Sequence, residues 1–189
     1  MRIFREPKAD GPAAGSVAMA VEQRVRRKRI LREAEGYLEL GMAEHTLDAL
    51  SRLDPDSTGR SDALYLEGEA LRSLDRCAEA LIPLEAAADV APGNVHVWLA
   101  LAWCYKRTGQ LPRAIEAMEQ AVEVDPHEAL LLYNLACYWS LSGDAQRSVD
   151  YLARAFELDA SFRDLVADEA DFDPIRNHPE LQALLTIIV

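Results

Sequence analysis

Apolar and small residues recur along the middle of the chain at helical spacing, and no stretch shows the strict alternation of a half-buried strand. Trp98, Leu101, Ala102 and Tyr105 follow one another at intervals of three, one and three residues, which places them on one side of a helix. From about residue 17 to residue 160, every periodic segment follows this spacing. The sequence therefore predicts an all-α protein.

The pattern also repeats at an interval of about 34 residues, the period of a helix–turn–helix array. The first set of positions is Trp98, Leu101, Ala102, Tyr105, Gly109, Ala114, Met118, Ala121 and Pro126. One period later stand Leu132, Leu135, Ala136, Trp139, Gly143, Ser148, Leu152, Ala155 and Ala160. One period earlier stand Leu64, Glu67, Gly68, Leu71, Asp75, Ala80, Leu84, Ala87 and Pro92, where Asp75 replaces the turn glycine. Three units are clear.

Each unit has the start and stop signals of two helices joined by a tight turn. In residues 95–128, Asn94 is a suitable N-cap for the first helix, and Gly109 interrupts that helix. Pro112 falls in the first turn of the second helix, where its missing N–H is tolerated, and Pro126 follows the end of that helix. Stacked hairpins of this kind bury a continuous core that one hairpin alone cannot form.

The spacing resembles the tetratricopeptide repeat, whose signature is W-x2-L-G-x2-Y, then A-x3-F, then P. The match is strongest over residues 95–128 and extends over about 27–162. A degenerate unit is indicated at 27–60, where Asp54 and Pro55 come early and predict a short second helix. The resemblance implies a solenoid of helical hairpins: three clear repeats, one degenerate N-terminal repeat and a C-terminal capping helix.

We expect six segments along the chain. They are a flexible arm over 1–16, a basic N-terminal helix with the degenerate repeat over 17–60, repeats over 61–94, 95–128 and 129–162, and a C-terminal cap over 163–189. The cap is expected because an open end of a solenoid would expose core side chains to water. The carboxylates of its Asp-rich stretch, 168–173, are interpreted as solvated side chains and helix caps rather than a cation site.

Charge divides the chain into a basic start and an acidic remainder. Nine of the 20 basic and three of the 32 acidic residues lie in residues 1–32, so this part carries +6 and the rest −18. We expect a helix beginning near Ser16 that buries Val17, Val21, Val25 and Leu31 and turns its cations to solvent. Docking of this helix on the acidic body is favoured over binding to nucleic acid or anionic lipid, because few aromatic residues interleave the cations.

No motif in the chain indicates catalysis, a cofactor or a metal. There is no P-loop, GxGxxG, HExxH or GxSxG sequence, and the four histidines are scattered. Cys77, Cys104 and Cys137 lack metal-ligand spacing and are interpreted as reduced core thiols. No apolar run is long enough to cross a bilayer, so we expect a non-enzymatic cytoplasmic protein without a membrane span.

The residues that the period does not assign to the core indicate a binding surface. The first helices of stacked hairpins line a concave groove. Trp98 is expected in the core, and Trp103, five residues later, is rotated from it by about 140 degrees. Trp103 therefore faces the groove or packs on the N-terminal helix or the cap. The candidate partner-binding residues are Tyr65, Glu69, Arg72, His96, Leu99, Trp103, Lys106, Arg107, Tyr133 and Asn134.

These residues predict an interaction scaffold that binds a protein or peptide partner in the groove. An apolar Trp103 beside Lys106 and Arg107 suits an acidic or carboxylate-ended peptide. The resemblance also implies that some relatives grip a carboxylate with Lys and Asn pairs, but Tyr65 and Glu69 stand where one such pair is expected. The alternatives are an assembly or secretion chaperone for an aggregation-prone client, and an adaptor that uses the basic segment. Self-association stays open.

Overall fold

The computed structural model describes residues 14–54 and 61–186, and within them every regular element is helical. The elements are α1 (Ala14–Glu39), α2 (Ala43–Ser51), α3 (Ser61–Ser73), α4 (Cys77–Val90), α5 (Val95–Arg107), α6 (Leu111–Val124), α7 (Ala129–Leu141), α8 (Ala145–Leu158), α9 (Phe162–Leu165), the 3-10 helix η2 (Ala170–Ile175) and α10 (Pro179–Thr186). Most of the flexible arm expected over 1–16, the loop that includes Pro55 and the last three residues lie outside the described part, as does the side chain of Val17.

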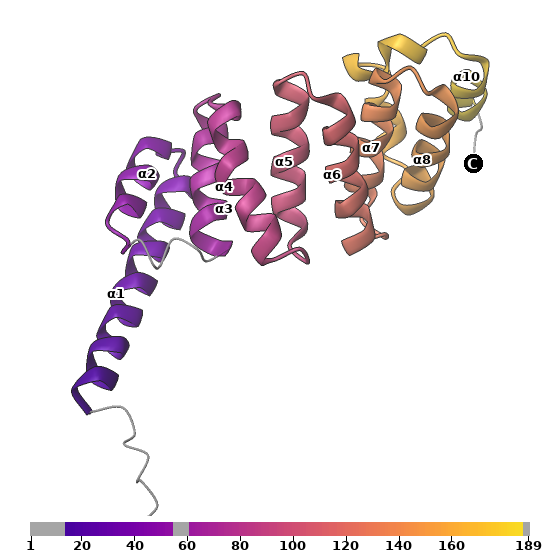
Figure 1. Ribbon diagram of the computed structural model, residues 1–189. Helices are drawn as coiled ribbons and strands as arrows, with labels where there is room; N and C mark the ends of the chain where they lie inside the picture. Colours follow the sequence, from indigo (N-terminus) through magenta and orange to yellow (C-terminus); the bar gives the residue numbers. More distant parts are fainter. Residues whose placement is uncertain (1–13, 55–60, 187–189) are drawn as a thin grey trace, which may run out of the picture.

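Consecutive helices pair as antiparallel hairpins, and the hairpins stand side by side in one curved row (Figure 1). The pairs α1–α2, α3–α4, α5–α6 and α7–α8 follow one another from the N-terminal to the C-terminal end, and α9, η2 and α10 cover the last pair. The N-terminal part of α1 projects away from the row (Figure 1). The expected all-α array of helical hairpins is confirmed.

The turns inside the hairpins share one backbone geometry. Gly41, Gly109 and Gly143 have φ values of 70°, 75° and 83°, a region that suits glycine because a side chain is strained there. Asp75 occupies the same place in the α3–α4 turn with a φ of 58°. Each turn closes with a hydrogen bond across it, for example from the Gln110 amide to the Tyr105 carbonyl at 2.8 Å.

Small residues at one column of the repeat bring the two helices of each hairpin together. Ala80 and Ala114 are fully buried there, and the same column holds Thr46 and Ser148. The Ser148 hydroxyl donates to the Ala136 carbonyl at 2.8 Å, and the Thr46 hydroxyl donates to the Ala34 carbonyl at 3.3 Å. These bonds satisfy two buried hydroxyls, and they show that the α1–α2 hairpin uses the same packing column as the later hairpins.

Two sequence expectations about the packing are wrong. Val21 and Val25 are 56% and 63% exposed, because α1 packs on its neighbours through a different face that includes Ile30 and Ala34. Trp98 is only partly buried, and its indole Nε1 donates to the Pro92 carbonyl at 2.7 Å. The core of the α5–α6 hairpin is instead filled by smaller side chains such as Leu101 and Met118.

The C-terminal segment is a substantial part of the core. Phe172 is fully buried, and Val166 and Leu181 are each 1% exposed. Phe172 packs edge-on against Tyr133 of α7, with ring centroids 5.6 Å apart. The segment therefore covers apolar side chains of the last hairpin that would otherwise meet water.

Candidate partner-binding groove

A hollow of about 410 Å³ lies on the face formed by the first helices of the hairpins. Its walls come from α3, α5 and α7 and from the C-terminal segment. Eight of the ten predicted partner-binding residues line it: Tyr65, Glu69, Arg72, His96, Leu99, Trp103, Lys106 and Asn134. The structure thus brings together most of the set that the repeat period indicates.

The other two predicted residues lie outside this hollow. Arg107 is exposed beside it, and its guanidinium is 5.5 Å from the centre of the Trp103 ring. Tyr133 is only 5% exposed, because Phe162 and Phe172 pack against its ring at centroid distances of 5.0 and 5.6 Å. Tyr133 is therefore a core residue beneath the cap.

Two arginines from different hairpins lie close to the Trp103 ring. The Arg72 guanidinium on α3 is 5.2 Å from the centre of the Trp103 ring, and the Arg107 guanidinium on α5 is 5.5 Å from it. Glu69 holds Arg72 through two hydrogen bonds of 2.7 and 2.8 Å, and this contact raises the pKa of the guanidinium. The ring is partly buried and still lines the hollow. Such an indole, fixed by cations, is a pre-organised apolar contact surface.

Carboxylates from elsewhere in the chain already pair with two of the cations. The Lys106 ammonium forms an ion pair with Asp171 of η2, and the exposed Arg107 pairs with Asp75 at 2.9 Å. An expected helix cap is present in the stretch 168–173, since the Glu169 side chain accepts a hydrogen bond from the Asp171 amide. The expectation of a solvated side chain is wrong for Asp171, which is 18% exposed. Glu169 and Asp171 are lining residues that the sequence analysis missed. They lie outside the repeat period, so the period gave no signal for them.

Two buried thiols, those of Cys104 and Cys137, lie at or near the hollow. Burial raises the pKa of Cys104 to about 12, so its thiol stays protonated at neutral pH. Burial also raises the pKa of Cys137, which lines the hollow, well above its usual range. Within residues 14–54 and 61–186, no three His, Cys, Asp or Glu side chains gather in a way that could hold a metal ion. The described helices also include none that is both long and apolar enough to cross a bilayer.

Comparisons with known proteins agree with this architecture. Residues 71–136 match the family model of the tetratricopeptide repeat. A search of curated proteins finds no match to the chain.

Among solved structures, a crystal structure of MamA aligns with a TM-score of 0.66 at 21% identity, covering 79% of this chain and 86% of the other. TTC0263, a thermophilic TPR protein from Thermus thermophilus, aligns with a TM-score of 0.60 at 18% identity, covering 83% and 94%. YrrB, described as a TPR protein with an unusual peptide-binding site, aligns with a TM-score of 0.60 at 18% identity, covering 67% and 66%.

The stacked hairpins and their hollow define a helical-repeat scaffold for protein–protein interaction, a class whose repeats are typically non-catalytic. Residues 71–136 match the tetratricopeptide repeat, and the row of hairpins as a whole has the fold of such repeat proteins.

Proposed function

We propose that the chain is a non-enzymatic scaffold that binds a segment of a protein partner in the groove around Trp103. The observation that carries this proposal is the partly buried Trp103 ring, which lines a hollow of about 410 Å³ and has the Arg72 and Arg107 guanidiniums 5.2 and 5.5 Å from its centre. Tryptophan and arginine are the residue types that most often dominate binding energy at interfaces. YrrB, whose fold is similar, has a peptide-binding site, and this supports the same mode by analogy of fold.

We propose further that the bound segment is acidic or ends in a carboxylate. Arg107 is the cation most readily recruited, because its pair with Asp75 is exposed on both sides, at 52% and 70%. Exposed pairs of this kind contribute little, so an incoming carboxylate can replace Asp75 at small cost. Lys106 is less available, because Asp171 and the Tyr138 ring already surround its ammonium. The proposal places the chain in the cytoplasm, which suits its three free cysteines.

The test is a selection of peptides from a displayed random library on the full chain, followed by binding measurements on the selected peptides. Trp103→Ala should weaken them roughly thirtyfold, as expected for a central aromatic anchor. Trp139→Ala is the matched control, because Trp139 is also a partly buried tryptophan but lies outside this hollow. Arg107→Gln should weaken only peptides with acidic residues.

Undiminished binding by a folded Trp103→Ala variant would place the binding surface elsewhere. A chaperone for an unfolded client would instead select no defined peptide motif and would bind long apolar segments with little dependence on Trp103.

A further inference from the structure

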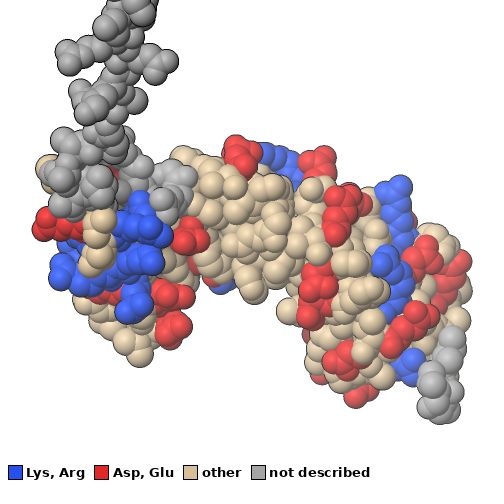
Figure 2. Space-filling view, turned by 90° about the horizontal axis from the view of Figure 1, so that it is seen from below, with Lys and Arg blue, Asp and Glu red and all other residues tan. Residues whose placement is uncertain are grey.

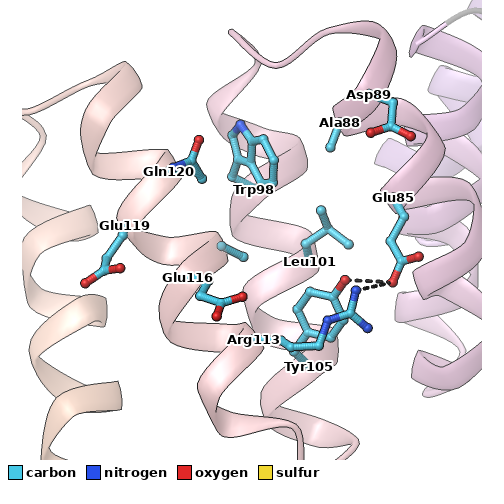
Figure 3. Close-up of a pocket in the computed structure, with 11 residues that line it drawn as sticks. Glu85, Ala88, Asp89, Trp98, Leu101, Tyr105, Arg113, Glu116, Glu119 and Gln120 are labelled. Carbon is cyan, nitrogen blue, oxygen red and sulfur yellow. Dashed lines mark hydrogen bonds and ion pairs between the residues drawn. The ribbon is translucent and has the colours of Figure 1, made fainter.

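A second hollow, of about 520 Å³, lies between α4 and α6 over the side of α5 that carries Trp98 (Figure 3). None of its lining residues belongs to the groove around Trp103. The lining residues are Glu85, Ala88, Asp89, Trp98, Leu101, Tyr105, Arg113, Glu116, Ala117, Glu119 and Gln120. It is a separate surface from the proposed peptide groove.

Trp98 forms the aromatic part of this hollow. Figure 3 shows its ring between Gln120 on α6 and Ala88 on α4. The hydrogen bond from its Nε1 to the Pro92 carbonyl fixes the indole, and the side chain remains partly exposed. A tryptophan ring held in this way can receive a cation on its face, which is the strongest form of cation–π contact among the aromatic side chains.

The charged residues around the ring are mostly acidic. Glu85 is neutralised, since it accepts hydrogen bonds from Tyr105 at 2.7 Å and from Arg113 at 3.0 Å (Figure 3). Arg113 also stacks on the Tyr105 ring, 4.2 Å from its centre. Asp89, Glu116 and Glu119 take part in none of the ion pairs found among the described residues. The hollow therefore presents three carboxylates outside those ion pairs, of which Glu119 also lines the next hollow, together with Arg147 and Arg154.

The corresponding hollow one repeat later contains a cation that the hollow around Trp98 lacks. It is lined by Glu119, Trp139, Arg147, Asp150, Tyr151 and Arg154. Arg147 stacks on Trp139 at 4.3 Å, as Arg113 stacks on Tyr105 one repeat earlier, and Arg154 adds a second cation, 5.3 Å from the centre of the Tyr151 ring. A shift of about 34 residues, the repeat period, places Arg154 where the first hollow has Gln120.

We propose that the hollow between α4 and α6 binds a lysine or arginine side chain from a basic segment of a protein partner. The cation lies on the Trp98 ring, and the carboxylates of Asp89 on one wall and Glu116 on the other compensate its charge. Charge complementarity selects this occupant, because an acidic segment would meet three like charges. The site does not depend on the groove around Trp103.

The probe is a fluorescent synthetic peptide with the sequence of residues 21–33, VEQRVRRKRILRE, which is a strongly basic segment. Binding to the full chain is followed by fluorescence anisotropy at low and at high salt. Asp89→Asn with Glu116→Gln should weaken binding about tenfold, because two charge contacts are lost. Asp48→Asn with Glu157→Gln is the matched control, since it removes the same charge from positions outside both hollows. The control should change the affinity less than about twofold.

A second variant tests whether a cation supplied by the chain itself can take the place of the bound one. Gln120→Arg introduces the residue type that the next repeat has at the equivalent position, Arg154. It should place a cation of the chain itself in the hollow and weaken binding of the probe about tenfold, as the double variant does. Gln120 is exposed, so thermal unfolding should stay unchanged. Equal losses in the two double variants would show diffuse attraction to the acidic body and overturn the proposal. The proposal would also be overturned if the probe did not bind, or if Trp103→Ala abolished its binding and Gln120→Arg did not.

Discussion

Lys106 of α5 forms an ion pair with Asp171 of η2, 65 residues further along the chain. The pair is partly buried, with side-chain exposures of 30% and 18%. It fastens the C-terminal segment to the same helix that carries Trp103. The cap therefore does more than cover the last hairpin, because it also neutralises a cation of the candidate groove.

Reversing one charge of this pair should loosen the cap. Lys106→Glu places a carboxylate beside Asp171 and Glu169, and we expect a loss of about 1–3 kcal/mol in the free energy of unfolding. Adding Asp171→Lys should restore most of that loss. Urea unfolding of the wild type, both single variants and the double variant measures the coupling. Additive losses would mean that the two side chains do not interact in solution.

Phe172 should be the most sensitive position of the cap. It is fully buried against Tyr133, so Phe172→Ala should lower the free energy of unfolding by about 3–5 kcal/mol. Leu165→Ala is the control, because Leu165 is 51% exposed and should change stability by less than about 0.5 kcal/mol. Equal, small effects at both positions would show that the segment is a separate appendage.

Gly68 should resist even the smallest enlargement. A Cβ there would lie 2.4 Å from Cγ of Leu84, which is fully buried and cannot move to solvent. Gly68→Ala should therefore cost about 1–3 kcal/mol by overpacking. The next repeat accommodates Ala102 opposite a methionine, Met118, so adding Leu84→Met should recover part of the loss. Thermal unfolding of the three variants tests this, and a single variant as stable as the wild type would contradict the close contact.

Stability should fall at alkaline pH. Burial raises the pKa of Cys104 to about 12, whereas a thiol in the unfolded chain titrates near about 8.5. The folded chain thus keeps a proton that the unfolded chain releases, so this contribution is complete below about pH 8.5 and is lost as the pH rises toward about 12. Burial also raises the pKa of Tyr133 and Tyr138, which extends the decline.

Urea unfolding at several pH values between about 8 and 11 measures this decline. Cys104→Ala should show a shallower decline than the wild type just above about pH 9, where the thiol of the unfolded chain titrates. An identical decline in both proteins would assign the effect to other groups.

The features set by the repeat period could be predicted from the sequence. Gly109 and Gly143 adopt the expected turn geometry, and the Asn94 side chain accepts a hydrogen bond from the His96 amide as an N-cap. These features depend only on neighbouring residues and on the column that a residue occupies, so spacing alone indicates them.

The features that depend on contacts outside the period could not be predicted. The partner of Lys106 comes from a segment without repeat spacing, and Trp98 is partly exposed because its indole bonds the Pro92 carbonyl. The exposure of Val21 and Val25 has the same cause, because the spacing of these residues does not indicate which face of α1 packs on its neighbours.

Figure 2 shows the Lys and Arg side chains of this region gathered on the surface. No ion pair in the described part joins those of residues 24–32 to the acidic body, so docking through these charges stays a prediction.

The covering of α7 by the C-terminal segment gives the groove a direction. Glu169 and Asp171 wall one side of the hollow, and Phe172 fills the space above Tyr133. A ligand bound as we propose would therefore meet the chain's own carboxylates where the groove reaches α7. The C-terminal segment thus takes part in setting how far along the row of hairpins a bound segment can extend.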